Sequence, residues 1–235
     1  MKTSALKKRL FAHLPDSFFR SDFWRRRLIR SYMESHATAK LQIGSGWNGM
    51  TGWLNTDIDP QWCRAGALYL DAGKPFPFPD ASFDYVYSEH LFEHLNHDQA
   101  VNMLNECRRI LKPEGAIRIA TPDFHFLTDL YLHPEKPVNR RYVEWASQGG
   151  GGGGYIPVPE VPLYVINKFH TEWGHQIIYD QDTLMELLKE HGFRNPRICE
   201  TGKSDIVAFQ NLEAHFRHMP YEFYELETMI LEADR

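Results

Sequence analysis

Short runs of apolar residues alternate with longer amphipathic stretches from residue 40 to the end of the chain. This alternation is typical of a parallel sheet that is covered by helices. We therefore expect an α/β protein with a mostly parallel, seven-stranded sheet. The expected strands lie at residues 41–44, 53–57, 67–71, 83–88, 116–121, 196–200 and 205–210.

Two of the amphipathic stretches carry clear helix start and stop signals. The first begins at Asp98, continues with apolar residues at helical spacing, and ends at the breaker sequence of residues 112–115. The second begins at Asp180, whose carboxylate can cap the helix, and ends before Gly192. A third amphipathic stretch, residues 221–233, predicts a C-terminal helix.

The first 39 residues differ from the rest and form a basic arm. Residues 1–40 carry ten Lys or Arg against three acidic residues. Aromatic and arginine residues alternate over residues 18–36, which predicts an amphipathic helix. Such a helix can lie on an anionic membrane surface or an acidic partner, or it can pack on the protein's own sheet with its arginines in solvent.

The overall composition is that of an ordinary soluble domain, with 43% hydrophobic and 24% charged residues. In residues 41–235, 16 basic residues face 28 acidic ones, a net charge of -12, so this part should repel nucleic acid. Cys63, Cys107 and Cys199 lie far apart and are odd in number, which indicates a reducing compartment. No apolar run approaches the roughly 20 residues of a membrane span, so we expect a cytoplasmic protein.

Residues 122–175 interrupt the alternating pattern with prolines and aromatic residues. They also contain six consecutive glycines, residues 149–154, and such a run specifies no structure because each glycine loses much backbone entropy on ordering. We therefore divide the chain into the arm, residues 1–39, and a domain, residues 40–235, with a flexible, lid-like insertion around residues 122–175.

The first apolar strand runs into glycines at the spacing G-x-G-x-x-G, beginning at Gly44 and ending at Gly49. Asp57 ends the next apolar run, where a carboxylate can accept both hydroxyls of an adenosine ribose. Dinucleotide-binding folds place a full helix between these two features, and its N-terminus binds a pyrophosphate. Only eight residues separate Gly49 from Asp57, so no such helix fits, and the pattern favours an adenosine ligand without phosphate.

The motifs that follow complete a pattern that resembles the class I S-adenosylmethionine-dependent methyltransferases, in particular the small bacterial type-11-like family. The resemblance covers residues 40–123 and continues more weakly to Phe193. It implies a doubly wound, Rossmann-like sheet with helices on both faces. The motifs are Asp71-Ala72, a Pro/Phe-rich turn at residues 75–79, Ser82-Phe83-Asp84-Tyr85-Val86, Glu89-His90-x-x-Glu93-His94-Leu95, a segment of residues 110–119, and Thr121-Pro122-Asp123.

The resemblance also implies where S-adenosyl-L-methionine binds. The turn after the first strand would pass under the methionine part, Asp57 would hold the ribose and Asp71 the adenine amino group. Gln42 stands where the family usually has an acidic residue, although its amide can still accept a hydrogen bond. The residues expected at the cofactor are Gly44, Ser45, Gly46, Asp57, Ile58, Asp71, Ala72, Ser88, Glu89 and His90.

Transfer of an activated methyl group needs a base only if the acceptor must lose a proton. His175, His90 and His94 are the candidate catalytic residues because imidazole titrates near neutrality, and each can equally be a structural histidine. We expect transfer to an O or N atom of a small molecule, with a sugar or a lipid-linked compound as the suggested acceptor. Side chains available to bind it are Asp123, His125, Tyr131, Tyr142, Trp145, Tyr164, His170 and Trp173.

Two other functions compete with this interpretation. The sequence His90-x-x-Glu93-His94 matches the inverted zinc-peptidase pattern, in which two histidines on one helical face bind zinc beside a glutamate base, and this predicts a zinc-dependent hydrolase. The other alternative is a non-catalytic relative that binds adenosine or a partner protein through its basic arm.

Overall fold

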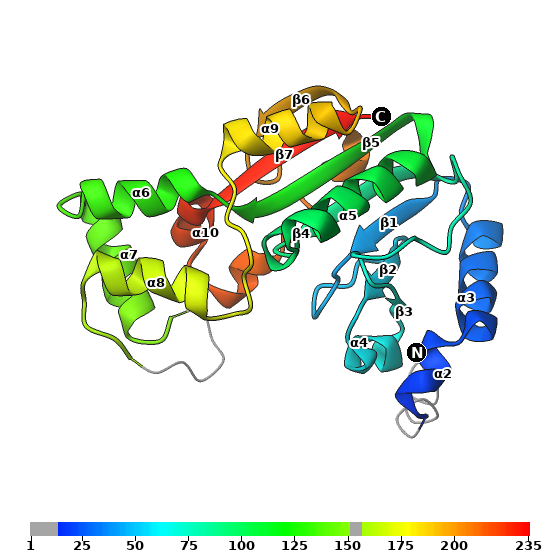
Figure 1. Ribbon diagram of the computed structural model, residues 1–235, viewed down its shortest axis with the longest axis horizontal. Coiled ribbons are helices and arrows are strands. Elements are labelled where there is room, and N and C mark those ends of the chain that lie inside the picture. The colour runs from blue at the N-terminus through cyan, green and yellow to red at the C-terminus, as the bar shows by residue number, and fades with distance from the viewer. Residues whose placement is uncertain (1–13, 151–156) are drawn as a thin grey trace.

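A computed structural model describes residues 14–150 and 157–235 and places a twisted seven-stranded sheet at the centre of the molecule (Figure 1). The spatial order of the strands is β3-β2-β1-β4-β5-β7-β6. Only β7 runs antiparallel to its neighbours, so the predicted α/β fold with a mostly parallel sheet is confirmed. The strands are β1 (Lys40–Ile43), β2 (Leu54–Asp57), β3 (Leu68–Tyr69), β4 (Phe83–Glu89), β5 (Leu111–Pro122), β6 (Arg194–Cys199) and β7 (Thr228–Asp234).

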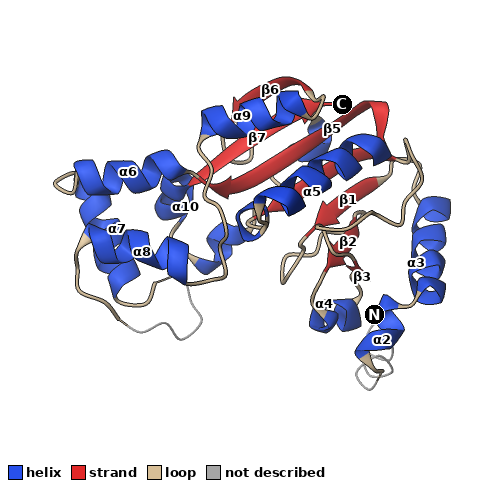
Figure 2. Cartoon of the chain, viewed as in Figure 1, coloured by secondary structure: helices blue, strands red, loops and turns tan. Residues whose placement is uncertain are grey.

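Within the described residues, α-helices cover one face of the sheet and extend beyond both ends of it (Figure 2). Residues 206–212 pack in a separate cluster against Trp53 and Tyr87, so the expected α-helices on both faces are not found there. The α-helices are α2 (Asp16–Arg20), α3 (Asp22–Ser35), α4 (Pro60–Ala65), α5 (His97–Ile110), α6 (Phe124–Leu132), α7 (Pro137–Ser147), α8 (Pro162–Thr171), α9 (Gln181–Glu190) and α10 (Tyr221–Glu227). The described residues also form three short 3-10 helices: η1 (Phe92–His94), η2 (Val207–Phe209) and η3 (His215–His218).

Both helices with clear end signals form where the sequence predicts them. Asp180 caps α9 by accepting a hydrogen bond from the Thr183 amide. The helix predicted from Asp98 starts one residue earlier, at His97, because Asn96 and Gln99 form a reciprocal capping box at the start of α5.

Two predictions at the C-terminal end are wrong. Residues 205–210 form a loop with the 3-10 turn η2, in which Val207 is exposed and Phe209 buried. The predicted C-terminal helix over residues 221–233 forms only in its first half, as α10, and the second half is β7, the seventh strand. Because β7 is hydrogen-bonded between β5 and β6, residues on both of its faces are buried, and a short run that is apolar on all sides does not distinguish a strand from a helix.

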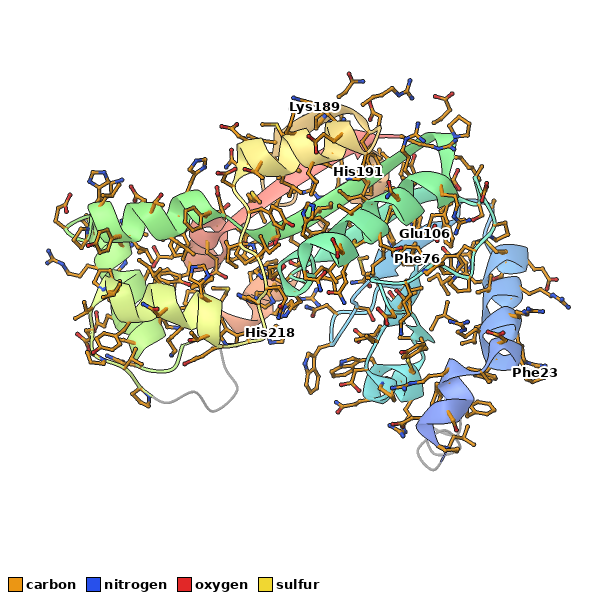
Figure 3. All side chains as sticks on the ribbon, in the orientation of Figure 1. Phe23, Phe76, Glu106, Lys189, His191 and His218 are labelled. Carbon is orange, nitrogen blue, oxygen red and sulfur yellow. The ribbon has the colours of Figure 1, made fainter. Side chains whose placement is uncertain are left out.

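The described part of the basic arm packs on the protein's own sheet. Ile29 and Tyr32 of α3 are buried in the main core, and the Tyr32 hydroxyl accepts a hydrogen bond from the Lys40 amide at the start of β1 (2.8 Å). The opposite side of α3 is in solvent, where Phe23 points away from the sheet (Figure 3). Contact of this exposed side with an anionic surface or acidic partner stays a prediction.

The insertion of residues 122–175 contains three helices, α6, α7 and α8, beside the carboxyl end of the sheet (Figure 1). Phe126, Tyr142 and Phe169 from these helices form a second apolar core together with Phe223 of α10. The described part of the predicted lid is therefore a packed helical unit. Most of the glycine run lies outside the described residues. No helix in the two described ranges is both long and apolar enough to span a bilayer.

A buried ion cluster fixes the loop between β6 and α10 to the sheet. Arg118 on β5 is fully buried and donates to Glu213 of the loop (2.7 Å) and to Glu232 of β7 (2.5 Å). It also donates to the backbone carbonyl of Lys203 (3.0 Å). This loop continues into η3, so the cluster helps to position residues that face the site described below.

Substituting Arg118→Met should lower the free energy of unfolding by about 3–5 kcal/mol, because it leaves two buried carboxylates without their shared cation. Urea denaturation measures the loss. The matched control is Arg141→Met, which breaks the ion pair between Arg141 and Glu222, both about half exposed, and should cost about 1 kcal/mol or less. Equal losses in the two variants would show that the buried cluster is not a strong structural constraint.

Candidate active site

A cavity of about 700 Å³ opens at the carboxyl ends of β1 and β4. In an open α/β sheet, ligands bind where the strand order reverses, and here the reversal lies between these two strands. The turn after β1 lines one side of the cavity, and the segment after β4 lines the floor. Helices α7 and α8 of the insertion and the segment from η3 to α10 line the remaining sides.

The glycine turn after β1 is built for close approach of a ligand. Gly44 and Gly46 have φ angles of +70° and +45°, which L side chains rarely adopt. A Cβ atom on Gly44 would lie 2.8 Å from the Leu91 side chain, whereas a Cβ on Gly46 would have no atom within 4 Å. Gly44 therefore permits the turn to pack on the segment after β4, and Gly46 leaves space that a ligand can occupy.

Asp57 and Asp71 lie at the ends of the neighbouring strands β2 and β3. The carboxylate of Asp57 accepts hydrogen bonds from the amides of Gly46 (2.8 Å) and Asp59 (2.9 Å), so it is fixed against the glycine turn. Asp71 accepts from the Gly73 amide (3.0 Å) and pairs with Lys74. The side chain of Ile58, beside Asp57, is 52% exposed although it is apolar.

The structure brings only some of the expected cofactor residues into the cavity. Gly44, Ser45, Gly46, Glu89 and His90 line it, whereas Asp57, Ile58, Asp71, Ala72 and Ser88 do not. The Oε1 atom of Gln42 and the Oγ atom of Ser88 are buried and find no hydrogen-bond partner within residues 14–150 and 157–235. Both belong to the strands that flank the strand-order reversal.

Glu89, expected at the cofactor, has its hydrogen bonds directed to another part of the chain. Its carboxylate accepts from the amides of Ala214 (2.9 Å) and His215 (3.0 Å) and from the Tyr224 hydroxyl (3.0 Å). It therefore holds η3 and α10 against the end of β4, which places His215 at the cavity.

His90 and Glu93 form a buried pair in the floor of the cavity. Nδ1 of His90 lies 3.3 Å from Oε1 of Glu93, and Nε2 lies 3.1 Å from the Thr228 hydroxyl. Burial alone would lower the pKa of His90, but the Glu93 carboxylate outweighs it and the pKa is raised above 6.5. Burial would likewise raise the pKa of Glu93, but His90 outweighs it and the pKa falls to about 2.

His94 and His175 meet on the other side of Glu93. Their rings are 4.8 Å apart at 78°, and Nε2 of His94 lies 4.0 Å from Oε1 of Glu93. Nδ1 of His175 is hydrogen-bonded to the Phe169 carbonyl (2.9 Å), which sets the tautomer with an unprotonated Nε2. Burial lowers the pKa of His175, so it is neutral at pH 7.

Three further titratable residues line the cavity although the sequence analysis did not select them: His215, Glu227 and His218. His215 stacks on His90 with the ring centres 3.9 Å apart, and burial followed by the charge of His90 lowers its pKa to about 3. Glu227 accepts a hydrogen bond from the Tyr142 hydroxyl, and burial raises its pKa to about 7. His218 lies nearby, where the insertion meets the sheet (Figure 3).

The interpretation of residues 90–94 as the helix of a zinc peptidase is wrong. His90 has a φ angle of +47°, outside the helical region, and only the single 3-10 turn η1 follows it. The two histidines are therefore not on one helical face. His90 stacks on His215, whereas His94 packs against His175.

Aromatic side chains from the insertion line the outer part of the cavity. Tyr142, Trp145 and Trp173 are among the residues expected to bind an acceptor, and all three line the cavity, as does Phe169. The remaining members of that expected set, Asp123, His125, Tyr131, Tyr164 and His170, do not line it.

Comparison with known proteins agrees with this architecture. Residues 41–119 match the family model of a methyltransferase domain. A structure of an S-adenosylmethionine-dependent methyltransferase from Mesorhizobium loti is similar, with 18% identity over 90% of this chain and 97% of that one and a TM-score of 0.50. One from Archaeoglobus fulgidus has 17% identity over 94% and 97% of the two chains and a TM-score of 0.49. No curated protein sequence is significantly similar to this chain.

The fold and the cavity at its switch point define a Rossmann-like methyltransferase architecture. The match of residues 41–119 to a methyltransferase-domain model agrees with the resemblance to class I S-adenosylmethionine-dependent methyltransferases that the sequence motifs predict. The predicted class of protein is thereby confirmed, and with it S-adenosylmethionine as the cofactor of this class of domain.

The raised pKa of His90 should depend chiefly on Glu93, whose hydrogen bond and charge are the largest of the effects that oppose burial. In the wild-type protein, NMR of the imidazole protons should give a His90 midpoint above pH 6.5. In Glu93→Gln the charge is removed while burial remains, so the midpoint should fall below pH 6.5. The control Glu186→Gln changes a surface carboxylate and should leave the His90 midpoint where it is. A midpoint above 6.5 in Glu93→Gln would contradict the pairing.

Proposed function

We propose that this protein is an S-adenosylmethionine-dependent methyltransferase that transfers a methyl group to an O or N atom of a small molecule. The observation that carries the proposal is a single cavity that joins the glycine turn after β1 to a cluster of imidazoles, carboxylates and aromatic rings. The turn is the part of the fold suited to a cofactor, and the cluster is suited to a second, polar molecule beside it.

The residues around the switch point fit the cofactor. Gly44, Ser45 and Gly46 would pass under the methionine part, and the open space at Gly46 supports this. Asp57 would accept from the ribose hydroxyls, since each of its oxygens accepts only one hydrogen bond from the backbone and a carboxylate oxygen has two acceptor sites. Ile58 would cover the adenine ring. Asp71, Ala72, Ser88, Glu89 and His90 complete the proposed cofactor site.

When bound, the cofactor supplies a sulfonium-activated methyl group, so that the sulfur-carbon bond breaks as the bond to the acceptor forms. The chain's part is to orient the acceptor, to exclude water and to take the proton of a hydroxyl or amine. Two groups in the cavity suit the last task. His175 is neutral and its Nε2 can accept a proton, and Glu227 has a pKa of about 7.

The acceptor proposed from these surroundings is polar and carries several hydroxyl or amino groups, such as a sugar or the head of a lipid-linked compound. Tyr142, Trp145 and Trp173 can stack on such a molecule, and the histidines can bond its hydroxyls. His90, with its raised pKa and its place beside Glu93, suits a role as hydrogen-bond donor better than one as base.

A non-catalytic adenosine-binding protein would share the cofactor site but would not need the cluster on the far side of the cavity. The two functions are distinguished by incubating the protein with S-adenosylmethionine carrying a labelled methyl group and with sugar and lipid-linked acceptors. Transfer to any acceptor establishes the enzyme, whereas binding without transfer to the whole panel favours the non-catalytic alternative.

Substituting Asp57→Ala should weaken binding of S-adenosylhomocysteine by about 1–3 kcal/mol, or roughly 5- to 150-fold, because the ribose hydroxyls lose their acceptor. Isothermal titration calorimetry measures the change. Asp59→Ala is the matched control, since Asp59 is two residues away and only caps α4, so its affinity should stay within about twofold of wild type. Equal affinity in wild type and Asp57→Ala would refute the ribose site.

Substituting Gly46→Ala tests whether the cofactor occupies the space beside the glycine turn after β1. The new methyl group meets no protein atom, so the variant should fold with a loss of about 1–2 kcal/mol from the positive φ angle. It should nonetheless lose most of its affinity for S-adenosylhomocysteine, because the methyl group occupies the ligand's space. Gly66→Ala, also at positive φ and with no atom near the added Cβ, is the control that should keep its affinity.

A further inference from the structure

We propose that Glu93, His94 and His175 form a binding site for a divalent transition-metal ion of the Zn²⁺ type, on the acceptor side of the cavity. One ligand atom from each residue lies within 4.8 Å of the other two. Oε1 of Glu93 and Nε2 of His94 are 4.0 Å apart. Ligands around a tetrahedral zinc ion are about 3.4 Å apart, so small rotations of the side chains are enough to close the site.

The two chain segments that supply the ligands are already joined by their backbones. Glu93 and His94 belong to η1, and His175 lies in the connection between α8 and α9. The carbonyl of Glu93 accepts hydrogen bonds from the amides of Gln176 (2.7 Å) and Ile177 (3.2 Å). The separation of the ligands is thus set by main-chain contacts rather than by flexible side chains.

The ligands are also oriented by the kind of outer contacts that metal sites require. A histidine ligand usually donates its other ring N–H to a carbonyl or carboxylate, and Nδ1 of His175 is bonded in this way to Phe169. A ligating carboxylate is usually hydrogen-bonded as well, and Oε2 of Glu93 accepts from the Thr121 hydroxyl (2.9 Å).

The remaining oxygen of Glu93 is poorly satisfied. Glu93 is fully buried, and its Oε1 atom forms no hydrogen bond of acceptable geometry in the described parts of the chain. Its nearest cationic neighbour is His90, at 3.3 Å. A buried carboxylate oxygen that faces a cavity with two imidazoles beside it is suited to a cation.

A second group of possible ligands, His90, His215 and Glu227, lies in the same cavity but is less suitable. The lone pairs of an imidazole lie in the plane of its ring. The rings of His90 and His215 are stacked with only 18° between their planes, so their lone pairs run side by side and do not converge. The rings of His94 and His175 are inclined by 78°, which allows convergence on one ion.

The donor set selects the kind of metal. Two imidazole nitrogens and one carboxylate oxygen are typical of zinc sites that keep an open position, whereas Mg²⁺ and Ca²⁺ prefer oxygen ligands throughout. The other carboxylates near the site are engaged, since Glu89 accepts from two amides and Glu227 from Tyr142. A fourth position is left for an oxygen atom from the cavity.

The role of the ion rests on the proposed function. A hydroxyl of the acceptor at the open position would lose its proton more readily, because a bound metal ion lowers the pKa of an oxygen ligand. Nε2 of His175 would then bind the metal and could not serve as base, so the proton would pass to the Glu227 carboxylate. Nε2 of His175 can either bind the metal ion or accept a proton, but it cannot do both. The metal titration decides between these two roles.

The test is a titration of chelator-treated full-length protein with Co²⁺, followed by absorption spectroscopy, and with Zn²⁺ in competition. We expect one ion per chain, with an affinity that falls at least 100-fold in His94→Asn and in His175→Asn. The matched control is His215→Asn, in the second group, which should change the affinity less than threefold. His94 is about one third exposed, so its variant is expected to fold even if changes at the buried Glu93 do not.

Two results would overturn the metal site: no specific ion uptake by the wild-type protein, or equal uptake by wild type and both ligand variants. A loss of metal affinity in His215→Asn but not in His94→Asn would likewise overturn the site. Calorimetry with S-adenosylhomocysteine on the same samples keeps this question separate from the proposed function. Nucleoside binding without metal uptake refutes only the metal site, and metal uptake without nucleoside binding refutes only the methyltransferase assignment.

Discussion

The reversal of strand order between β1 and β4 is the constraint on which the site depends. The two strands pair in parallel, with Ile43 opposite Ser88, so both strands end at neighbouring points on the same edge of the sheet. From there β1 continues into the glycine turn and β4 into the segment of Glu89 to His94. A cofactor loop and a cluster of titratable residues thus lie beside each other because of backbone pairing alone.

Buried polar and charged groups connect distant segments of the chain to the carboxyl edge of the sheet. Glu89 holds η3 and α10, and Arg118 holds the loop that leads to them. The carbonyl of Glu93 holds the segment that carries His175. Each of these groups would be costly to bury without its partners, so the contacts are strong restraints on segments that are distant in sequence. The cavity walls are therefore positioned by polar contacts, whereas the sheet behind them is held by apolar packing.

The helical insertion and the basic arm are placed at opposite ends of the sheet (Figure 1). The arm closes the edge near β3 with the apolar side of α3 and leaves its arginines in solvent. The insertion adds its own small core and presents aromatic side chains to the cavity.

Local signals in the sequence were sufficient for most of the fold and for the cofactor loop. Apart from residues 205–210, the strand-length apolar runs lie where the sequence predicts, as do the cap at Asp180 and the glycines with positive φ, because all of these depend on near neighbours in the chain. Strand β7 was not predictable in this way, because its conformation is set by pairing with β5 and β6 rather than by its own residues. The same reason explains why His215 and Glu227 were missed: nothing near them in sequence indicates that Glu89 and the Arg118 cluster bring them to the cavity. The sequence by itself determined the type of sheet and the turn that approaches a ligand, since both follow from short-range sterics and hydrophobic periodicity. Only the tertiary structure decided which histidines face one another, because that depends on contacts between segments up to 138 residues apart.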